Sequence, residues 1–215
     1  MRWSRTLALA LAVAPAARGA HVTLNSGRRI EAARIVADED GTVAIATPDG
    51  RKMAFRKGQY REAVADRPAE LDRAREAVRA GRFEEAMRLL EAVERRYRGL
   101  RWDETAAARL GDLLFEAGRF EEAIERYRKV RVPAPETARR FRTALERAGR
   151  VEELTALLRR DVAGGSRAEA ARAYAWLARL NERAGRAEAA RIDRLKLELF
   201  FSEFAKEERS KEEKE

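Results

Sequence analysis

Histidine and cysteine supply much of the nucleophilic and metal chemistry of proteins, and both are nearly missing from this chain. The sequence has one histidine, His21, and no cysteine. A Ser-His-acid or Cys-His site needs a positioned imidazole or thiol, whereas we expect His21, beside a predicted cleavage region, to be flexible. A copper site on a processed N-terminal His21 would require cleavage after Ala20 and a second histidine. We therefore predict no catalytic and no metal-binding residues.

Acidic residues are abundant, but arginines are interleaved with them. Such mixed sequences on helices form solvated ion-pair surfaces, for example between Glu122 and Arg126, which are four residues apart. A Gly-rich loop that could cradle phosphate does not occur in the sequence. We predict that the protein is not an enzyme and uses no cofactor.

The elements that carry these charges are expected to be helical. The 215 residues are 45% hydrophobic and 39% charged, and Ala, Arg, Glu and Leu dominate, as in amphipathic helices. No apolar run approaches the roughly 20 residues that span a bilayer.

Residues 1–20 have the pattern of a signal peptide. Arg2 and Arg5 precede a short apolar stretch, and small residues follow, with cleavage predicted after Ala16 or Gly19. Removal of residues 1–16 takes two arginines and lowers the formal charge from +9 to +7. The pattern predicts a periplasmic or secreted protein without a transmembrane segment in the mature chain; an uncleaved N-terminus is the alternative.

Residues 21–62 have a different periodicity. The runs VTL, RIEAARIV, TVAIAT and KMAF alternate apolar residues between turn sequences, which predicts a small four-strand β meander. A segment this short is marginal for independent folding, so we expect it to lean on the first helix that follows.

The remainder of the chain is repetitive. AGRFEEA occurs at residues 80–86 and again at 117–123, and related turns place glycines at Gly81, Gly118, Gly149 and Gly185. Helical periodicity flanks each glycine. We predict about four helical hairpins over residues 66–205, with a charged tail at 206–215.

The repeated residues have a packing explanation. Glycine can end the first helix of a hairpin with positive φ, small residues such as Gly111 and Ala123 let two helices approach closely, and Phe83 and Phe120 are expected to fill the space below the turn.

Helix ends are marked by capping residues. We expect Asp103 to cap one helix, Ser166 and Glu169 to form a capping box, and a last helix to run from Arg186 through Phe204. The LELFFSEF segment within that helix has two interpretations: it covers the open end of the stack, or it offers its aromatic residues to a partner.

The second hairpin resembles the tetratricopeptide repeat (TPR) consensus. The matching residues are Leu110, Gly111, Leu114, Gly118, Phe120, Ala123, Tyr127 and Pro135. The resemblance implies a mainly α hairpin solenoid, of the bacterial envelope type, whose first helices line a concave surface that binds peptides or helices. The segment 21–62 is similar to small SH3-like or Sm-like β half-barrels, without a motif specific to either.

On the TPR register, arginines dominate the implied concave lining. They are Arg75, Arg79, Arg139, Arg147, Arg172, Arg179 and Arg183, with Asp112, Glu116, Glu146 and Glu182 among them. Because arginine binds carboxylates bidentately, an acidic protein or peptide partner is implied. The asparagines of a carboxylate clamp are missing there, and an ordinary solvated surface is the alternative.

These observations predict an exported scaffold that mediates protein–protein interaction and has no small-molecule substrate. The alternative is a binder of anionic polymers. Nucleic acid is not the expected ligand, because the arginines alternate with glutamates and do not form one aromatic-lined basic patch.

Overall fold

A computed structural model describes residues 19–205 of the chain. The predicted signal sequence, apart from its last two residues, and the predicted charged tail lie outside these residues. The chain divides into two compact units, Met1–Phe141 and Arg142–Glu215, each of which is described by itself below.

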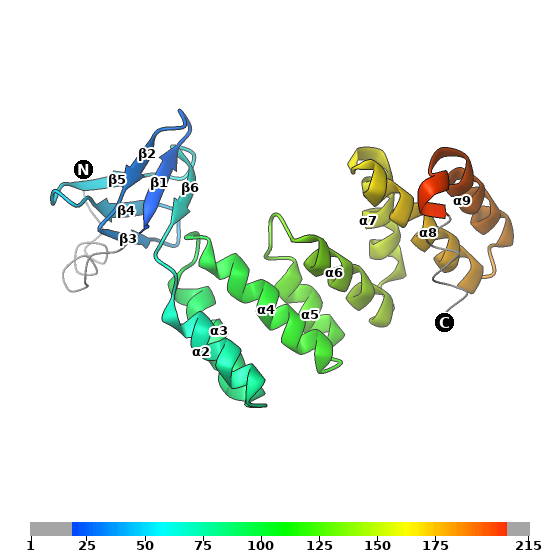
Figure 1. The fold of residues 1–215 in the computed structure, drawn as a ribbon, viewed down its shortest axis with the longest axis horizontal. Helices are drawn as coiled ribbons and strands as arrows, with labels where there is room; N and C mark the ends of the chain where they lie inside the picture. Colours follow the sequence, from blue (N-terminus) through cyan, green and yellow to red (C-terminus); the bar gives the residue numbers. More distant parts are fainter. Residues whose placement is uncertain (1–18, 206–215) are drawn as a thin grey trace. The chain divides into compact units, whose positions relative to one another are not determined.

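The N-terminal part of the first unit is a β segment of two three-stranded antiparallel sheets (Figure 1). One sheet has the order β2-β1-β6 and the other the order β3-β4-β5. The strands are β1 (His21–Leu24), β2 (Arg29–Glu31), β3 (Arg34–Ala37), β4 (Val43–Ala46), β5 (Lys52–Phe55) and β6 (Tyr60–Val64). The prediction of four strands was therefore wrong, because the segment has six.

The predicted strand RIEAARIV is two strands because the chain changes sheets in its middle. The Ala32 amide donates to Ala20 O at 2.9 Å in the first sheet, and the next amide, Ala33 N, donates to Ala46 O at 2.7 Å in the second. The other missed strand, β6, pairs with β1 in the register His21↔Val64. The change of sheets and the formation of β6 have no local sequence signal, since both depend on a partner strand that is distant in the sequence.

The β segment packs on the connection between the second and third helices that follow, and not on the first helix as expected. Leu100, only 2% exposed, belongs to the same core as Val22 and Ile45. Trp102 Nε1 donates to Ala65 O at 2.8 Å. The helical region thus supplies part of the core that this short segment lacks.

The prediction of a flexible His21 was also wrong. His21 lies in β1 with 8% of its surface exposed, and its Nδ1 is 2.8 Å from Gly19 O. Its imidazole is a structural group of the sheet.

Eight helices of eight or more residues follow in the described residues, and residues 202–205 are also helical. The eight helices are α2 (Ala69–Arg79), α3 (Phe83–Arg96), α4 (Trp102–Glu116), α5 (Phe120–Tyr127), α6 (Pro135–Arg147), α7 (Val151–Gly164), α8 (Arg167–Arg183) and α9 (Ala187–Phe200). In the first unit α2 pairs with α3 and α4 with α5 as hairpins (Figure 1). The predicted class, mainly α with TPR-like hairpins after a small β segment, is confirmed.

The hairpins of the first unit stack through a continuous apolar core. Leu71 from α2, Leu90 from α3 and Leu110 from α4 are at most 1% exposed and belong to one cluster. Arg126 of α5 adds a polar link, because it contacts Glu91 at 3.1 Å and Glu94 at 2.8 Å on α3. The expected local pair of Arg126 with Glu122 does not form; Glu122 pairs with Arg119 instead.

The four turn glycines behave as predicted. Gly81, Gly118, Gly149 and Gly185 have φ of 72°, 72°, 72° and 69°. After Gly118, the Arg119 amide donates to Leu114 O at 2.8 Å, a bond that closes the end of α4, and the same bond recurs after the other three glycines.

The two copies of AGRFEEA differ in how their phenylalanines pack. Phe120 contacts Phe115 edge to face, with ring centroids 5.5 Å apart, whereas Phe83 is 55% exposed. The position equivalent to Phe115 in the first copy is Val78, whose side chain is smaller. The expectation that Phe83 fills the space below its turn was wrong.

Of the two expected helix caps, one is present and the other is not. Ser166 and Glu169 form the capping box of α8, with reciprocal bonds of 3.3 and 2.7 Å. Asp103 is instead the second residue of α4, and its Oδ2 accepts from Gly99 N at 2.7 Å. The N-cap of α4 is Arg101, with an unusual φ of 76°.

The last helix is shorter than predicted. α9 ends at Phe200, because Phe201 has an extended φ of −139° and turns the chain, and the chain is helical again at residues 202–205. Phe201 and Phe204 then pack with Leu197 against α8, in agreement with the capping interpretation. Leu199 and Phe200 remain 67% and 61% exposed, as the partner interpretation requires.

No helix within residues 19–205 combines the length and the apolar composition that crossing a bilayer demands.

Candidate binding surfaces

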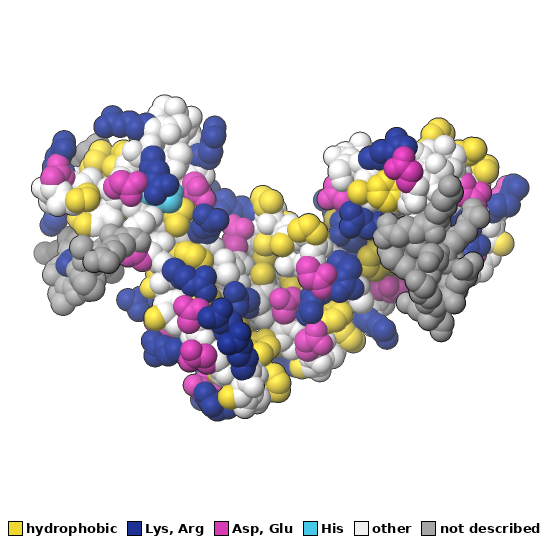
Figure 2. Space-filling model, in the orientation of Figure 1, with side chains coloured by type: hydrophobic (Ala, Val, Ile, Leu, Met, Phe, Trp, Pro, Cys, Tyr) yellow, Lys and Arg dark blue, Asp and Glu magenta, His cyan; other side chains and the backbone are white. Residues whose placement is uncertain are grey.

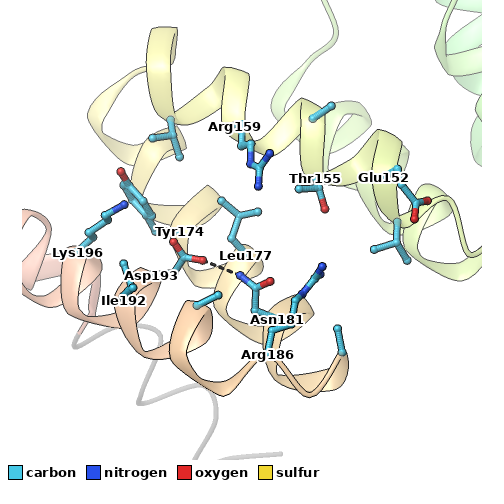
Figure 3. A pocket seen from close by; sticks show the side chains of 15 residues that line it. Glu152, Thr155, Arg159, Tyr174, Leu177, Asn181, Arg186, Ile192, Asp193 and Lys196 are labelled. Atoms are coloured by element: carbon cyan, nitrogen blue, oxygen red, sulfur yellow. Dashed lines mark hydrogen bonds between the residues drawn. The ribbon is translucent and has the colours of Figure 1, made fainter.

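A groove of about 840 Å³ lies in the second unit between α7, α8 and α9 (Figure 3). Its α7 wall consists of Val151, Glu152, Thr155, Ala156, Arg159 and Val162. Tyr174, Leu177, Asn181 and Ala184 form the floor, and Arg186, Ala189, Ile192, Asp193 and Lys196 form the α9 wall.

Helical periodicity explains why these residues meet. Tyr174, Leu177 and Asn181 are spaced by three and four residues and share one face of α8. Each wall extends over about ten residues, or about 15 Å at the rise of an α-helix. The groove is therefore about three helical turns long.

Two polar contacts fix side chains within the groove. Asn181 Nδ2 donates to Asp193 Oδ2 at 2.9 Å and joins the floor to the α9 wall (Figure 3). Lys196 Nζ lies 5.6 Å from the centroid of the Tyr174 ring, within the range of a cation–π contact.

Two arginines of the groove differ from Arg142 and Arg194 of the same unit in having no ion pair among the described residues. Arg142 pairs with Asp161 at 2.6 Å and Arg194 with Glu182 at 2.5 Å. Arg159 and Arg186, by contrast, form no ion pair with any residue of the described range 19–205. Both are exposed, and in Figure 3 they extend into the groove from opposite walls.

The predicted arginines of the first unit lie on α2 and α6. Arg75 pairs with Asp72 at 3.1 Å, and Arg139 pairs with Glu136 at 2.6 Å. Hydrogen bonds from Arg139 and then Arg140 lower the pKa of Glu136 to about 2. Arg79 is exposed at the end of α2 and has no ion-pair partner among the described residues.

The other predicted arginines belong to the second unit. Arg172, Arg179 and Arg183 project from α8, and Arg147 ends α6. Arg172 Nε donates to Ala168 O at 3.1 Å, and Arg183 pairs with Glu146.

Helix geometry separates these arginines from the groove. At about 3.6 residues per turn, Arg172, Arg179 and Arg183 project from the face of α8 opposite to Tyr174 and Leu177. α8 therefore presents two distinct surfaces, of which the TPR register predicted only the arginine-bearing one. The groove was missed because it depends on how α7 and α9 are spaced.

A second hollow, of about 700 Å³, lies in the first unit between the β segment and the helices. Its lining mixes acids such as Asp40 and Glu104 with bases such as Arg61 and Arg131. Glu104 and Arg131 pair with each other at 2.5 Å. Burial raises the pKa of Asp103 in this wall.

Charges of both signs intermingle on the face drawn in Figure 2. Within residues 19–205, no group of three or more metal-ligating side chains occurs. The face drawn in Figure 2 thus carries a mixed-charge surface.

The comparisons with known proteins agree with the hairpin geometry. Residues 77–148 match the family described as tetratricopeptide repeat. No curated protein matches the chain.

Solved structures are similar to this chain over part of its length. The MamA fragment from residue 41 to the end, from Desulfovibrio magneticus RS-1, is 22% identical, with a TM-score of 0.47, and the match covers 62% of this chain and 75% of that one. A putative kinesin light chain from Podosopora anserina with nearly identical TPR-like repeats is 20% identical, with a TM-score of 0.48, and the match covers 64% and 75%.

The family match of residues 77–148, together with the helical hairpins of the structure, indicates a TPR-like repeat fold in that part of the chain. Repeats of this kind generally present extended surfaces that bind protein partners.

Proposed function

We propose that this chain is an exported scaffold that binds a protein partner through the first helices of its hairpins. The observation that carries the proposal is the arginine-bearing face of α8, where Arg172, Trp176, Arg179 and Arg183 follow one another at helical spacing. Arginine and tryptophan are the residue types that most often dominate binding at protein interfaces.

The arginine-bearing face is structurally organised. Trp176 Nε1 donates to Glu146 at 3.2 Å, and Glu146 also accepts from Arg183. One carboxylate thus orients an aromatic and a cationic side chain from α8. Pre-orientation of this kind reduces the entropy lost when a partner binds.

The test of this surface is charge reversal in the full chain. Cross-linked pull-down from envelope fractions should recover a discrete protein with the unchanged chain, and the double variant Arg172→Glu with Arg183→Glu, both on α8, should recover much less. A matched control is Arg160→Glu with Arg191→Glu, at exposed positions of α7 and α9. Equal recovery with both double variants would reject this surface.

The same experiment separates a protein partner from an anionic polymer. Polymer binding would appear as retention on heparin that falls steeply with salt and would change equally in the two double variants, since both change the charge by the same amount.

Export rests on the signal pattern of residues 1–20, and the β segment supports one of the two cleavage positions. Ala20 is fully buried, and Gly19 O contacts the His21 ring at 2.8 Å. Cleavage after Gly19 would place a charged amine on buried Ala20 and remove that contact, which is unfavourable. Cleavage after Ala16 keeps both residues.

N-terminal sequencing of the protein from a periplasmic fraction tests this step. We expect the mature chain to begin at Ala17. A start at Ala20 would reject the argument from burial, and an intact Met1 in that fraction would reject processing.

A further inference from the structure

We infer that the groove between α7 and α9 binds an acidic amphipathic helix of a protein partner. The inference rests on the proposed scaffold function and adds a second surface, on the opposite side of α8 from Arg172. It names the chemistry of the segment bound there.

The apolar part of the groove determines one face of the ligand. Leu177 lies in the floor, Val151 and Val162 lie on the α7 wall, and Ile192 lies on the α9 wall. Ile192 remains 41% exposed, so apolar surface is available for burial. An apolar strip about three turns long between two helices matches the apolar face of a docked helix.

The charges of the groove determine the other part of the ligand. Arg159 and Arg186 enter from opposite walls, and neither has an ion-pair partner among the described residues (Figure 3). A helix with leucines on one face and carboxylates along its borders would pair with both arginines while it covers the floor. Bonds between guanidinium and carboxylate groups are stronger than neutral hydrogen bonds.

The basic residues of the lining outnumber the acidic ones. Asp193 is held by Asn181, and Glu152 lies in the first turn of α7, at one end of the wall. With Arg159, Arg186 and Lys196 against these two acids, the lining has a formal charge of 3 − 2 = +1.

The chain's own C-terminal sequence is a poorer candidate for this site. Residues 206–215, KEERSKEEKE, contain carboxylates but no apolar side chain for the floor. We therefore assign the groove to a separate protein.

The probe that tests this inference is a fluorescein-labelled amphipathic peptide with leucines on one helical face and glutamates elsewhere. Its matched counterpart carries lysine in place of every glutamate. Fluorescence anisotropy with the full chain should show saturable binding of the acidic peptide only. No binding of the acidic peptide, or equal binding of the two peptides, would overturn the inference.

Two variants locate the site. Arg159→Glu with Arg186→Glu should weaken binding of the acidic peptide at least about tenfold, as expected for the loss of charge-assisted hydrogen bonds. The control, Arg160→Glu with Arg191→Glu, has the same change of charge at exposed positions outside the groove and should bind nearly as the unchanged chain does. Ile192→Asp tests the apolar wall independently and should also weaken binding.

The remaining outcomes separate this inference from the scaffold proposal. Weakening by Arg172→Glu with Arg183→Glu, but not by the groove variants, would overturn the groove and leave the scaffold proposal standing. A chain that ends at Ala205 and binds the probe about tenfold more tightly than the full chain would assign the groove to the chain's own tail and overturn the inference.

Discussion

The ring of Tyr127 lies against the backbone of Gly111, where α5 crosses α4. A Cβ atom built on Gly111 would be only 2.6 Å from Tyr127 Cε1. Tyr127 is 3% exposed, and its hydroxyl donates to Asp112 at 2.9 Å, so the ring cannot move aside freely. The small residue at position 111 thus sets the distance between the two helices of this hairpin.

Replacing this glycine should destabilise the protein even though alanine favours helices. We expect Gly111→Ala to lower the free energy of unfolding by about 1–3 kcal/mol, because overpacking exceeds the gain in helix propensity. Urea denaturation measures the difference. The matched control is Gly164→Ala at the end of α7, where an added Cβ meets open space; a loss as large there would attribute the effect to something other than Tyr127.

The turn glycines make a second prediction. At Gly118, with φ of 72°, substitution by alanine should cost about 1–2 kcal/mol, since an L-residue is disfavoured in the left-handed region. Gly118→Asn should be less destabilising, because asparagine tolerates this conformation better. Equal losses for the two variants in thermal or urea unfolding would contradict the backbone explanation.

Leu100 tests the dependence of the β segment on the helices. Leu100→Ala should lower the free energy of unfolding by about 2–5 kcal/mol, because it leaves a cavity in the core of that segment. Hydrogen exchange should accelerate first in β1 and β6. Leu199→Ala, at a position that is 67% exposed, should change stability by less than about 0.5 kcal/mol and leave β-strand exchange unchanged.

The environment of Asp112 predicts that the stability of the protein depends on pH in a specific way. Burial is the largest cause of its raised pKa in the folded protein. As the pH rises past the ordinary pKa of aspartate, Asp112 loses its proton in the unfolded chain but keeps it in the folded protein. The contribution of this group to stability therefore falls, until the pH reaches the raised pKa and the folded protein also releases the proton. Below the unfolded pKa the carboxyl is protonated in both states, and the contribution is complete.

The variant Asp112→Asn isolates this effect, because an amide oxygen can still accept from Tyr127. The free energy of unfolding of the variant, relative to that of the unchanged protein, should increase between about pH 3 and the raised folded pKa and then level off. Parallel urea titrations over that range measure the difference. A constant difference would show that burial of Asp112 does not shift its pKa.

Replacing Arg101 should make the protein more stable. It is the only residue other than glycine with positive φ in the described range 19–205, at 76°, and its side chain lies 3.8 Å from Glu62 in an exposed pair. Such pairs contribute little, so Arg101→Gly should stabilise the protein by about 1 kcal/mol through relief of strain. A loss of stability would instead assign Arg101 a structural role through its side chain.

Local features of the structure were readable from the sequence. The positive φ of Gly118 and the capping box of Ser166 with Glu169 depend on residues within a few positions of one another, so their types and spacing were sufficient. The TPR-like class followed because one interface is reused from hairpin to hairpin, and its residue types therefore recur along the chain.

Only the tertiary structure decided those contacts in which a residue distant in sequence replaces a local partner. Arg126 forms ion pairs with Glu91 and Glu94 of α3 and not with nearby Glu122, because both carboxylates of that neighbouring helix are within reach of its long side chain. The chain changes sheets at Ala32 because β1 and β4 offer hydrogen-bond partners that the local sequence does not reveal. The groove containing Arg159 and Arg186 likewise exists only because α7 and α9 are separated from each other where both pack against α8. The packing of whole helices sets this separation.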